Sequence, residues 1–407
     1  MPSAAKPNLT PKLRFPEFRG ELGWEILPLK SACQMQAGKF VQASDIFGKP
    51  KEGLFPCYGG NGLRGYTKTF THSGKYSLIG RQGALCGNVK LVTGDFHATE
   101  HAVVATARSG INIDWLFYTL ELSNLNQYAT GQAQPGLSVE VLDKVSIAFP
   151  PKEKEQQKIA ECLGTLDELM GAESQKLDAL KAHKKGLMQQ LFPRAGETRP
   201  RLRFPEFQNA SEWKSDSLGE IFETSTGGTP SRSTKEYWNG GIPWITTSLV
   251  DFCVITEAEE FISAAGLENS SAKLFPQGTV LMALYGQGKT RGQVALLGIE
   301  AATNQACAAI LPRSDIDPYF VFLNLAGRYE QLRALSNAGG QENLSQGLIR
   351  EIPFSFPSDE DEQRKVTACL SSLDDLIAAQ SDKLAALQTH KQGLIQQLFP
   401  SPSEVRP

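Results

Sequence analysis

Residues 155–193 read EQQKIAECLGTLDELMGAESQKLDALKAHKKGLMQQLFP, and residues 362–400 read EQRKVTACLSSLDDLIAAQSDKLAALQTHKQGLIQQLFP. The two segments are identical at 23 of 39 positions, a level that chance does not produce. The chain therefore contains one element twice, at an offset of 207 residues, and this duplication decides which folds are open to it.

Both segments carry an apolar pattern at alternating steps of four and three residues. In the first segment the steps fall on 159, 163, 166, 170, 173, 177, 180, 184, 187 and 191, and eight of these ten residues are apolar. The exceptions are Glu173 and Lys184, and in the second segment they are Gln380 and Lys391. This spacing predicts a coiled-coil helix, and a helix of this length spans roughly 57 Å. The Phe-Pro pairs at 192–193 and 399–400 are expected to end the two helices.

Each helix could bury its apolar stripe against its own globular region, or the two helices could pair with each other. Two matched helices in one chain favour pairing. A globular region precedes each helix, so antiparallel pairing would place these regions at opposite ends of a rod with an approximate two-fold axis. Parallel pairing would crowd them together. We expect the antiparallel arrangement.

The duplication extends beyond the helices. The hexapeptide LRFPEF at 13–18 returns at 202–207, and Trp24 returns at Trp213, an offset of 189. Between these markers and the helices only a skeleton is shared, which includes ATEHA at 98–102 against ATNQA at 302–306. The second copy is longer by 18 residues (207 − 189), and most of the extra length lies between residue 218 and about 280. Two similar frameworks therefore carry dissimilar inserts.

The repeats predict an α+β fold with two mixed α/β globular regions. The predicted parts are an N-terminal arm 1–18, a first region 19–150, a helix 151–193, a linker 194–207, a second region 208–357, a helix 358–400 and a tail 401–407. Residues 75–79 and 278–282 are predicted strands, and residues 114–125 and 318–335 are predicted helices.

Composition places the chain among ordinary globular proteins. Its 407 residues carry 41 basic and 44 acidic side chains, a net charge of −3, which excludes a protein that coats nucleic acid by bulk charge. Seven widely spaced cysteines include no CxxC pair, and no apolar run has the length of a membrane span. We expect a soluble, reduced, cytoplasmic protein that has no contact with a membrane.

Two motifs resemble catalytic sites, and neither predicts catalysis. His97 and His101 fit the HxxEH string of some zinc peptidases, but the following valines favour strand, and the second copy has Ala301 and Gln305 at the corresponding places. Residues 286–290, GQGKT, resemble the end of a P-loop, but its first glycine is replaced by Ala283. We expect no catalytic residue and no bound metal or cofactor in this chain.

Loops rich in residues that read base edges remain as candidate DNA contacts. In the first region these are Tyr58, Asn61, Arg64, Tyr66, Lys68, Arg81 and Gln82. In the second region they are Thr229, Ser231, Arg232, Lys235, Thr246, Thr247, Tyr285, Gln287, Lys289 and Arg291. The first region has a net charge of +2 (12 basic, 10 acidic) and the second −6 (10 basic, 16 acidic), so most phosphate contacts are expected from a partner.

The framework resembles that of the specificity subunits of type I restriction-modification systems. The resemblance rests on Leu137-Ser138, Phe149-Pro150 and Glu155-Gln156 through Leu163 and Asp167, repeated around Glu362-Gln363 to Asp374. It rests also on the order of variable region, helix, variable region, helix, and on residues 228–245, which are similar to the opening of a target recognition domain. The resemblance covers residues from about 12 to 400.

The resemblance implies two target recognition domains joined by an antiparallel coiled coil with pseudo-two-fold symmetry. Each domain would read one half of a bipartite, asymmetric target in double-stranded DNA. The helices would fix the spacing and dock two modification subunits, which carry S-adenosylmethionine and methylate adenine, while restriction subunits cleave. Two other classes stay open: a coiled-coil protein that binds other proteins, and a metal- or nucleotide-dependent hydrolase.

Overall fold

The computed structural model describes residues 9–83, 85–131, 135–194, 196–286, 289–335 and 343–400. The chain divides into two compact units. One contains the residues up to 174 together with those from 382 on, and the other contains residues 175–381. Each unit therefore holds one globular region and part of both long helices. The domain boundaries expected from the sequence stay predictions, and the predicted tail 401–407 lies outside the described residues.

The two predicted long helices are present. Helix α3, Glu153–Leu191, and helix α9, Glu360–Leu398, each have 39 residues. All ten heptad positions of α3 and all ten of α9 are buried or half-buried. Gly164, Gly171 and Gly186 leave α3 continuous, because burial of the stripe outweighs the roughly 1 kcal/mol that each glycine costs.

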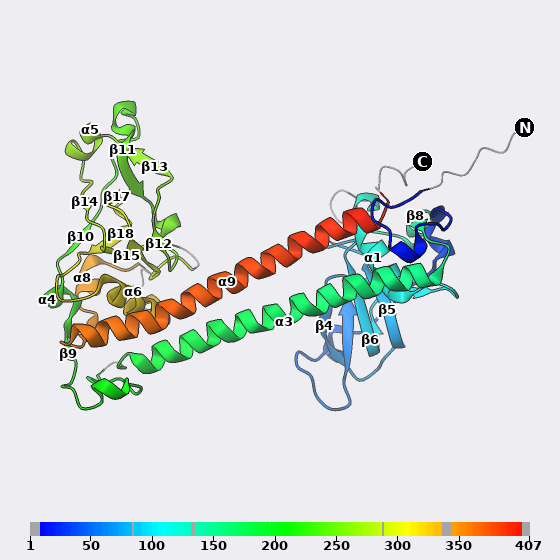
Figure 1. The fold of residues 1–407 in the computed structure, drawn as a ribbon, viewed down its shortest axis with the longest axis horizontal. Coiled ribbons are helices and arrows are strands. Elements are labelled where there is room, and N and C mark those ends of the chain that lie inside the picture. The colour runs from blue at the N-terminus through cyan, green and yellow to red at the C-terminus, as the bar shows by residue number, and fades with distance from the viewer. Residues whose placement is uncertain are drawn as a thin grey trace, which may run out of the picture. The chain divides into compact units, whose positions relative to one another are not determined.

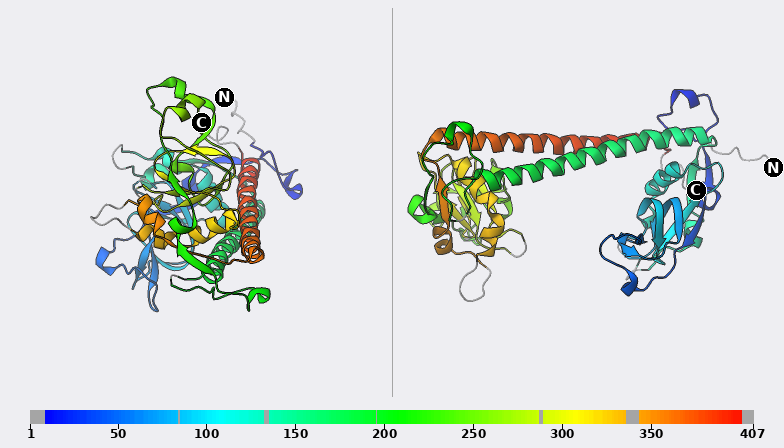
Figure 2. Two further views of the ribbon diagram at one scale, coloured as in Figure 1. Left: turned by 90° about the vertical axis from the view of Figure 1, so that its left-hand side faces the viewer. Right: turned by 90° about the horizontal axis from the view of Figure 1, so that it is seen from below.

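In the first unit the beginning of α3 packs beside the end of α9 (Figures 1 and 2). The Nζ atom of Lys391 lies 2.6 Å from the carboxylate of Asp167, and that of Lys383 lies 2.5 Å from Glu173. Residue numbers thus rise along one helix as they fall along the other. The two segments are antiparallel.

The second unit repeats this contact with the other halves of the helices. The Nζ atom of Lys184 lies 2.5 Å from the carboxylate of Asp374, and these residues are the counterparts of Lys391 and Asp167. The two lysines that interrupt the heptad pattern are therefore half-buried partners of ion pairs. Antiparallel pairing is confirmed within each unit, while the two-fold relation of the whole chain stays a prediction.

The helix ends complete the two cores. Phe399, directly after α9, packs edge-to-face on Trp24 with ring centroids 5.8 Å apart, and Phe192, directly after α3, packs on Trp213 at 6.3 Å. Each helix therefore starts beside one globular core and ends in the other.

The first globular region is built on a six-stranded sheet with the order β2-β7-β5-β6-β3-β4, in which only β3 and β6 pair in parallel. Strands β1 and β8 form a separate antiparallel ribbon. The elements are β1 Glu25–Pro28, β2 Cys33–Ala37, β3 Phe55–Gly59, β4 Gly62–Thr67, β5 His72–Gly80, β6 Val89–Ala98, β7 Ala102–Ala107, α1 Ile113–Leu122, α2 Val139–Leu142 and β8 Ser146–Phe149. Figure 1 places α1 and β8 near the start of α3.

The predicted strand 75–79 lies within β5, whereas the predicted helix 114–125 is too long. Helix α1 ends at Leu122, since Asn124 takes a left-handed conformation with φ of 43° and a 3₁₀ turn, Leu125–Tyr128, follows.

The second globular region has two sheets, ordered β10-β18-β15-β16-β12 and β13-β11-β17-β14, and a ribbon β9-β19 that corresponds to β1-β8. The strands are β9 Lys214–Ser217, β10 Thr224–Thr226, β11 Trp238–Ile245, β12 Val254–Ile255, β13 Glu260–Ile262, β14 Leu274–Phe275, β15 Val280–Ala283, β16 Val294–Leu297, β17 Ala301–Thr303, β18 Cys307–Ile310 and β19 Pro353–Phe356. The helices are α4 Leu218–Ile221, α5 Ala264–Glu268, α6 Pro318–Gly327, α7 Tyr329–Ala334 and α8 Gln346–Arg350.

Two predictions for this region need correction. The predicted helix 318–335 is two helices, α6 and α7, because the backbone leaves the α conformation at Arg328, whose guanidinium donates to the carbonyl of Pro353 at 2.6 Å. The predicted strand 278–282 begins only at Val280, since Gly278 has a φ of +89°.

In the described part of the chain no helix is both long enough and apolar enough to cross a membrane.

A buried ion pair ties the start of α3 to the N-terminal hexapeptide. The Nε and Nη2 atoms of Arg14 each donate to one oxygen of Glu155 at 2.7 Å, and the indole of Trp24 donates to Glu155 at 3.1 Å. Arg14 is 7% exposed and Glu155 is 1% exposed. The hydrogen bonds to Glu155 raise the pKa of the Arg14 guanidinium, which stays charged.

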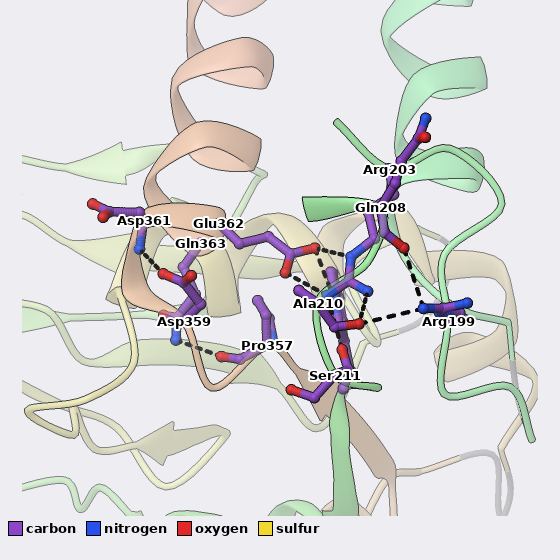
Figure 3. Close-up of polar contacts among 11 residues, drawn as sticks. Arg199, Arg203, Gln208, Ala210, Ser211, Pro357, Asp359, Asp361, Glu362 and Gln363 are labelled. Atoms are coloured by element: carbon purple, nitrogen blue, oxygen red, sulfur yellow. Dashed lines mark hydrogen bonds and ion pairs between the residues drawn. The ribbon is translucent and has the colours of Figure 1, made fainter. Parts of the chain in front are cut away.

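The second copy contains the same cluster, and Figure 3 shows its Arg203 and Glu362. Arg203 donates twice to Glu362 at 2.7 Å, Trp213 donates to Glu362 at 3.0 Å, and the guanidinium also holds the carbonyls of Ala210 and Ser211, each at 2.9 Å. We call each Arg–Glu–Trp cluster a latch.

The glutamine after each latch carboxylate extends the connection to the globular region. The Oε1 atom of Gln156 accepts from the backbone N–H of Asn112, the residue that caps α1, at 2.8 Å. The Oε1 atom of Gln363 accepts from the backbone N–H of Asp317, the residue that caps α6, at 2.8 Å. The start of each long helix is thereby fixed to the start of a helix in the adjoining globular region.

Replacing Glu155 by Gln is expected to lower the free energy of unfolding of the first unit by about 3–5 kcal/mol, because it leaves the buried Arg14 guanidinium without its counter-charge. Urea titration followed by tryptophan fluorescence measures this loss, and Glu362→Gln should give a comparable loss in the second unit. Glu17→Gln, at a surface-exposed ion pair with Lys158, is the matched control and should change little. Equal effects of Glu155→Gln and Glu17→Gln would contradict the role of the latch.

Candidate nucleic-acid interface

The first set of candidate residues lies on a hairpin. Strands β3 and β4 pair antiparallel, with Gly60 and Asn61 as a two-residue turn between Gly59 and Gly62. The sequence predicted a loop for Tyr58, Asn61, Arg64, Tyr66 and Lys68. That prediction is wrong for Tyr58, Arg64 and Tyr66, which lie on β3 and β4, because the glycines, including Gly62 with a φ of +90°, make the turn of a hairpin. Asn61 lies in that turn, and Lys68 directly follows β4. Asn61, Arg64 and Lys68 are exposed, and Tyr66 is half-buried.

The hairpin turn packs closely on the other two candidates of this region. A Cβ atom at Gly60 would lie 3.0 Å from the carbonyl oxygen of His101 and 3.2 Å from that of Gln82. The backbone N–H of Arg81 donates to the carbonyl of His101 at 2.9 Å, and the His101 Nδ1 atom lies 2.8 Å from Gln82 Oε1. The hairpin turn, Arg81 and Gln82 therefore meet around His101.

A hollow of ≈ 160 Å³ opens beside this turn. Its lining includes the glycines of the hairpin turn and Gly80, together with Tyr58, Asn61, Asn88 and Lys90. The Lys90 ammonium lies 5.6 Å from the centre of the Tyr58 ring, and burial raises the pKa of the Tyr58 hydroxyl, which stays protonated. The hollow combines a cation, two amides and a ring. These groups suit a base edge.

In the second region the candidates from two segments lie near the turn that holds Gln305. The Thr229 hydroxyl donates to Gln305 Oε1 at 2.5 Å. The backbone N–H of Asn304 donates to the carbonyl of Ile245 at 3.0 Å, which brings Thr246 and Thr247 beside the same turn. Thr246 shares a hydrogen bond of 2.5 Å with Ser248.

Arg232 lies beside this group on an aromatic surface. Its guanidinium carbon is 3.7 Å from the ring centre of Trp238 and 5.1 Å from that of Trp244, and both Nη atoms donate to Glu260. Ser231, which shares a hydrogen bond with Ser233, and Lys235 are exposed on the same segment.

Two of the four remaining candidates, Lys289 and Arg291, are tied to α7. The Tyr329 hydroxyl donates to the carbonyl of Lys289 at 2.5 Å, and Arg291 donates to the carbonyl of Arg333 at 3.1 Å. Tyr285 is 44% exposed, and its neighbour Leu284 donates to the carbonyl of Ala306, at the turn that holds Gln305. Gln287 lies outside the described residues.

The two regions place an aromatic ring and a cation at the same point of the framework. Tyr58 pairs with Ala98 across the parallel strands β3 and β6, and Trp244 pairs with Ala302 across β11 and β17. Ala98 and Ala302 are counterparts in the repeated ATEHA and ATNQA segments. The ring carries Lys90 in one copy and Arg232 in the other.

The sequence did not predict four members of these surfaces, which are Lys90, Asn88, His101 and Gln305. The repeated segments ATEHA and ATNQA, which place His101 and Gln305 at matching positions, were the available signal, but they were interpreted as framework only.

The two histidines of the HxxEH string contact polar groups of the chain itself. His97 is buried, with its ring nitrogens 3.2 Å from the Thr69 hydroxyl and 3.1 Å from the carbonyl of Lys39, while His101 contacts Gln82. Among the residues that the structure describes, no group of three or more His, Cys, Asp or Glu side chains is placed to hold a metal ion. Residues 287–288 of the P-loop-like segment lie outside that part of the chain.

A comparison with protein families matches both copies. The description "Type I restriction modification DNA specificity domain" fits residues 21–182 and again residues 210–389, which together are most of the chain. The chain belongs to this family.

Curated relatives of the specificity-domain family support the assignment. The chain is 50% identical over 142 residues to the type I restriction enzyme EcoprrI specificity subunit of Escherichia coli, a match that spans 35% of each protein. It is 30% identical over 171 residues to the MjaIX specificity subunit of Methanocaldococcus jannaschii, which spans 41% of this chain and 39% of the relative. These matches thus take in little more than a third of the relatives' own length.

Solved structures show that the fold is shared across the whole chain. The type I restriction-modification S subunit from M. genitalium has a TM-score of 0.65 at 18% identity, with 97% of this chain and 100% of that chain covered. A second structure, from work on complex assembly and conformational transition of the type I system, has a TM-score of 0.58 at 16% identity and covers 93% and 98%. The fold of the specificity-domain family therefore accounts for both globular regions and both long helices.

Proposed function

We propose that this chain is the DNA-sequence specificity subunit of a type I restriction-modification enzyme. Each globular region reads one half of a bipartite, asymmetric target in double-stranded DNA. The observation that carries the proposal is the repeated framework with unlike polar surfaces at the same point: the Lys90–Tyr58 hollow in one copy and the Arg232–Trp244 surface in the other. Unlike surfaces on like frameworks suit two different half-sites.

The chemistry belongs to partner subunits. Two modification subunits bind S-adenosylmethionine and methylate adenine, restriction subunits cleave, and this chain supplies recognition without a catalytic residue or cofactor of its own. The net charge of −3 supports this division, because phosphate neutralisation then has to come from the partners. We infer that the assembly acts in the cytoplasm.

The long helices set the number of unread base pairs between the half-sites. Half-sites one helical turn apart are separated by about 34–36 Å, and a 39-residue helix spans roughly 58 Å. A pair of helices of this length, latched at Glu155 and Glu362, suits a spacing element of fixed reach.

The chain alone is expected to transfer no methyl group, whereas its complex with the cognate modification subunit should methylate adenine at a split site. Exchange of residues 19–150 for the variable region of another member of the family should change one half of that site and leave the other half and the spacing intact. Genome-wide mapping of N6-methyladenine measures both results. Methyl transfer by the chain alone, or a change in both halves, would contradict the proposal.

The outer faces of the helices offer one matched contact for each modification subunit. Leu169 in α3 and its counterpart Leu376 in α9 are 42% and 54% exposed, although both are leucines in long heptad helices. An exposed alanine follows each of them by three residues, Ala172 and Ala379. An apolar strip repeated on the framework supports binding of the same partner twice.

Leu169→Asp and Leu376→Asp are each expected to reduce the number of bound modification subunits from two to one, and the double variant should bind neither. Binding should weaken by roughly tenfold or more per site, since a charge replaces a buried apolar contact. Native mass spectrometry of the complex counts the subunits. The neighbouring charge variants Glu168→Gln and Asp375→Asn are matched controls that should keep both. Retention of two subunits by the double variant would locate the contact elsewhere.

A further inference from the structure

Arg232 of the second recognition region is held on two sides. Its two Nη atoms donate to the two oxygens of Glu260, with Nη2 at 3.1 Å, and its guanidinium carbon lies 3.7 Å from the ring centre of Trp238. The guanidinium is thus oriented by a carboxylate at its donor edge and by an aromatic ring at its face. The hydrogen bonds to Glu260 raise the pKa of Arg232, and the same bonds lower the pKa of Glu260, so both groups are charged.

The aromatic platform under Arg232 is fixed by the fold. The indole of Trp238 donates to the carbonyl of Ser231 at 3.1 Å, and that of Trp244 donates to the carbonyl of Gly228 at 3.0 Å. The two rings meet edge-to-face with centroids 5.1 Å apart. Trp244 stands directly opposite Glu260 across β11 and β13, so platform and carboxylate belong to one sheet.

The pair nevertheless faces solvent. The side chains of Arg232 and Glu260 are 56% and 37% exposed. A ligand can therefore approach the donor edge of the guanidinium and displace the carboxylate without unfolding the sheet. An exposed ion pair contributes little to stability. A stability role for the pair therefore does not explain why two fixed tryptophan rings support it.

The two oxygens of a carboxylate present a planar arginine with the same pattern as the O6 and N7 atoms of guanine, two acceptors side by side. We propose that Glu260 is an internal stand-in for guanine: it holds Arg232 in the geometry that reads guanine and releases it only to a base edge that offers two acceptors. This inference rests on the proposed function and deepens it for the second half-site.

A phosphate would be a poorer ligand for this place. The second region has a net charge of −6, and Glu257 and Glu259 stand close to Glu260 in the sequence. Like charges repel a DNA backbone at this surface, whereas a neutral guanine edge meets no such repulsion. The arrangement thus favours base reading over phosphate binding.

Glu260 competes with the DNA base for the donors of Arg232, and this competition makes base recognition selective. A guanine replaces both hydrogen bonds that Arg232 gives up, while an adenine or a pyrimidine replaces fewer and leaves the guanidinium and the carboxylate less satisfied. Removal of the negative charge from Glu260 should therefore strengthen binding to incorrect sequences more than to the correct one.

The test uses the complete complex with the modification subunits and a DNA library randomised over both half-sites, with methylation as the readout. Wild type should select guanine, on either strand, at a position of the second half-site. Arg232→Ala should reduce that selection by roughly tenfold to a hundredfold. Glu260→Gln should accept other bases at the same position and bind non-target DNA more tightly, with the rest of the target unchanged.

Lys90→Gln in the first region is the matched control, since Lys90 lies over the ring equivalent to Trp244 and should affect only the first half-site. A uniform loss of binding to all sequences in Arg232→Ala would show a phosphate contact and overturn the inference. A second half-site without any G·C pair, or unchanged selectivity in Glu260→Gln, would also overturn it. Failure of the wild-type complex to methylate any bipartite site would instead refute the proposed function. Thermal unfolding of each variant confirms that the fold is kept.

Discussion

A buried carboxylate at the start of each long helix holds this structure together. Glu155 and Glu362 are each about 1% exposed, and each is paired with an arginine and a tryptophan from the preceding framework segment. A buried carboxylate costs several kcal/mol unless the groups that donate hydrogen bonds to it stay in place. The latch therefore favours one arrangement of the arginine, the tryptophan and the carboxylate. The adjacent glutamine carries that geometry to the cap of α1 or α6. The direction in which each helix leaves its recognition region follows from these contacts.

The two copies share the buried contacts of the framework and differ in the polar surfaces that the framework carries. The latch, the ribbons β1-β8 and β9-β19 and the heptad stripes are repeated, whereas the surfaces around Tyr58 and Trp244 differ in their cation, in their neighbouring strands and in net charge. Substitutions on those surfaces leave the buried framework contacts unchanged. One framework thereby presents two different polar surfaces within a single chain.

The sequence predicted the long helices and their antiparallel pairing because a 3.5-residue pattern over five heptads is a strong, local signal. It did not predict the hairpin β3-β4, since glycines that form a hairpin turn also fit a loop, nor the break at Arg328, which depends on a carbonyl of a distant strand. The roles of Arg14, Trp24 and Glu155 were also missed. They lie as far as 141 positions apart, and only their repetition in the second copy at Arg203, Trp213 and Glu362 linked them.

In the proposed function, the long helices are the element that fixes the spacing between the two half-sites. The most direct measurement is the length of the unread spacer in a chain with one extra heptad inserted after Ser174 and another after Ser381, positions that correspond in the two copies. Seven residues lengthen each helix by about 10 Å, which equals about three base pairs of DNA. Methylation mapping should show both half-sites unchanged and the spacer longer by about three base pairs. An unchanged spacer, or altered bases in either half-site, would contradict the account.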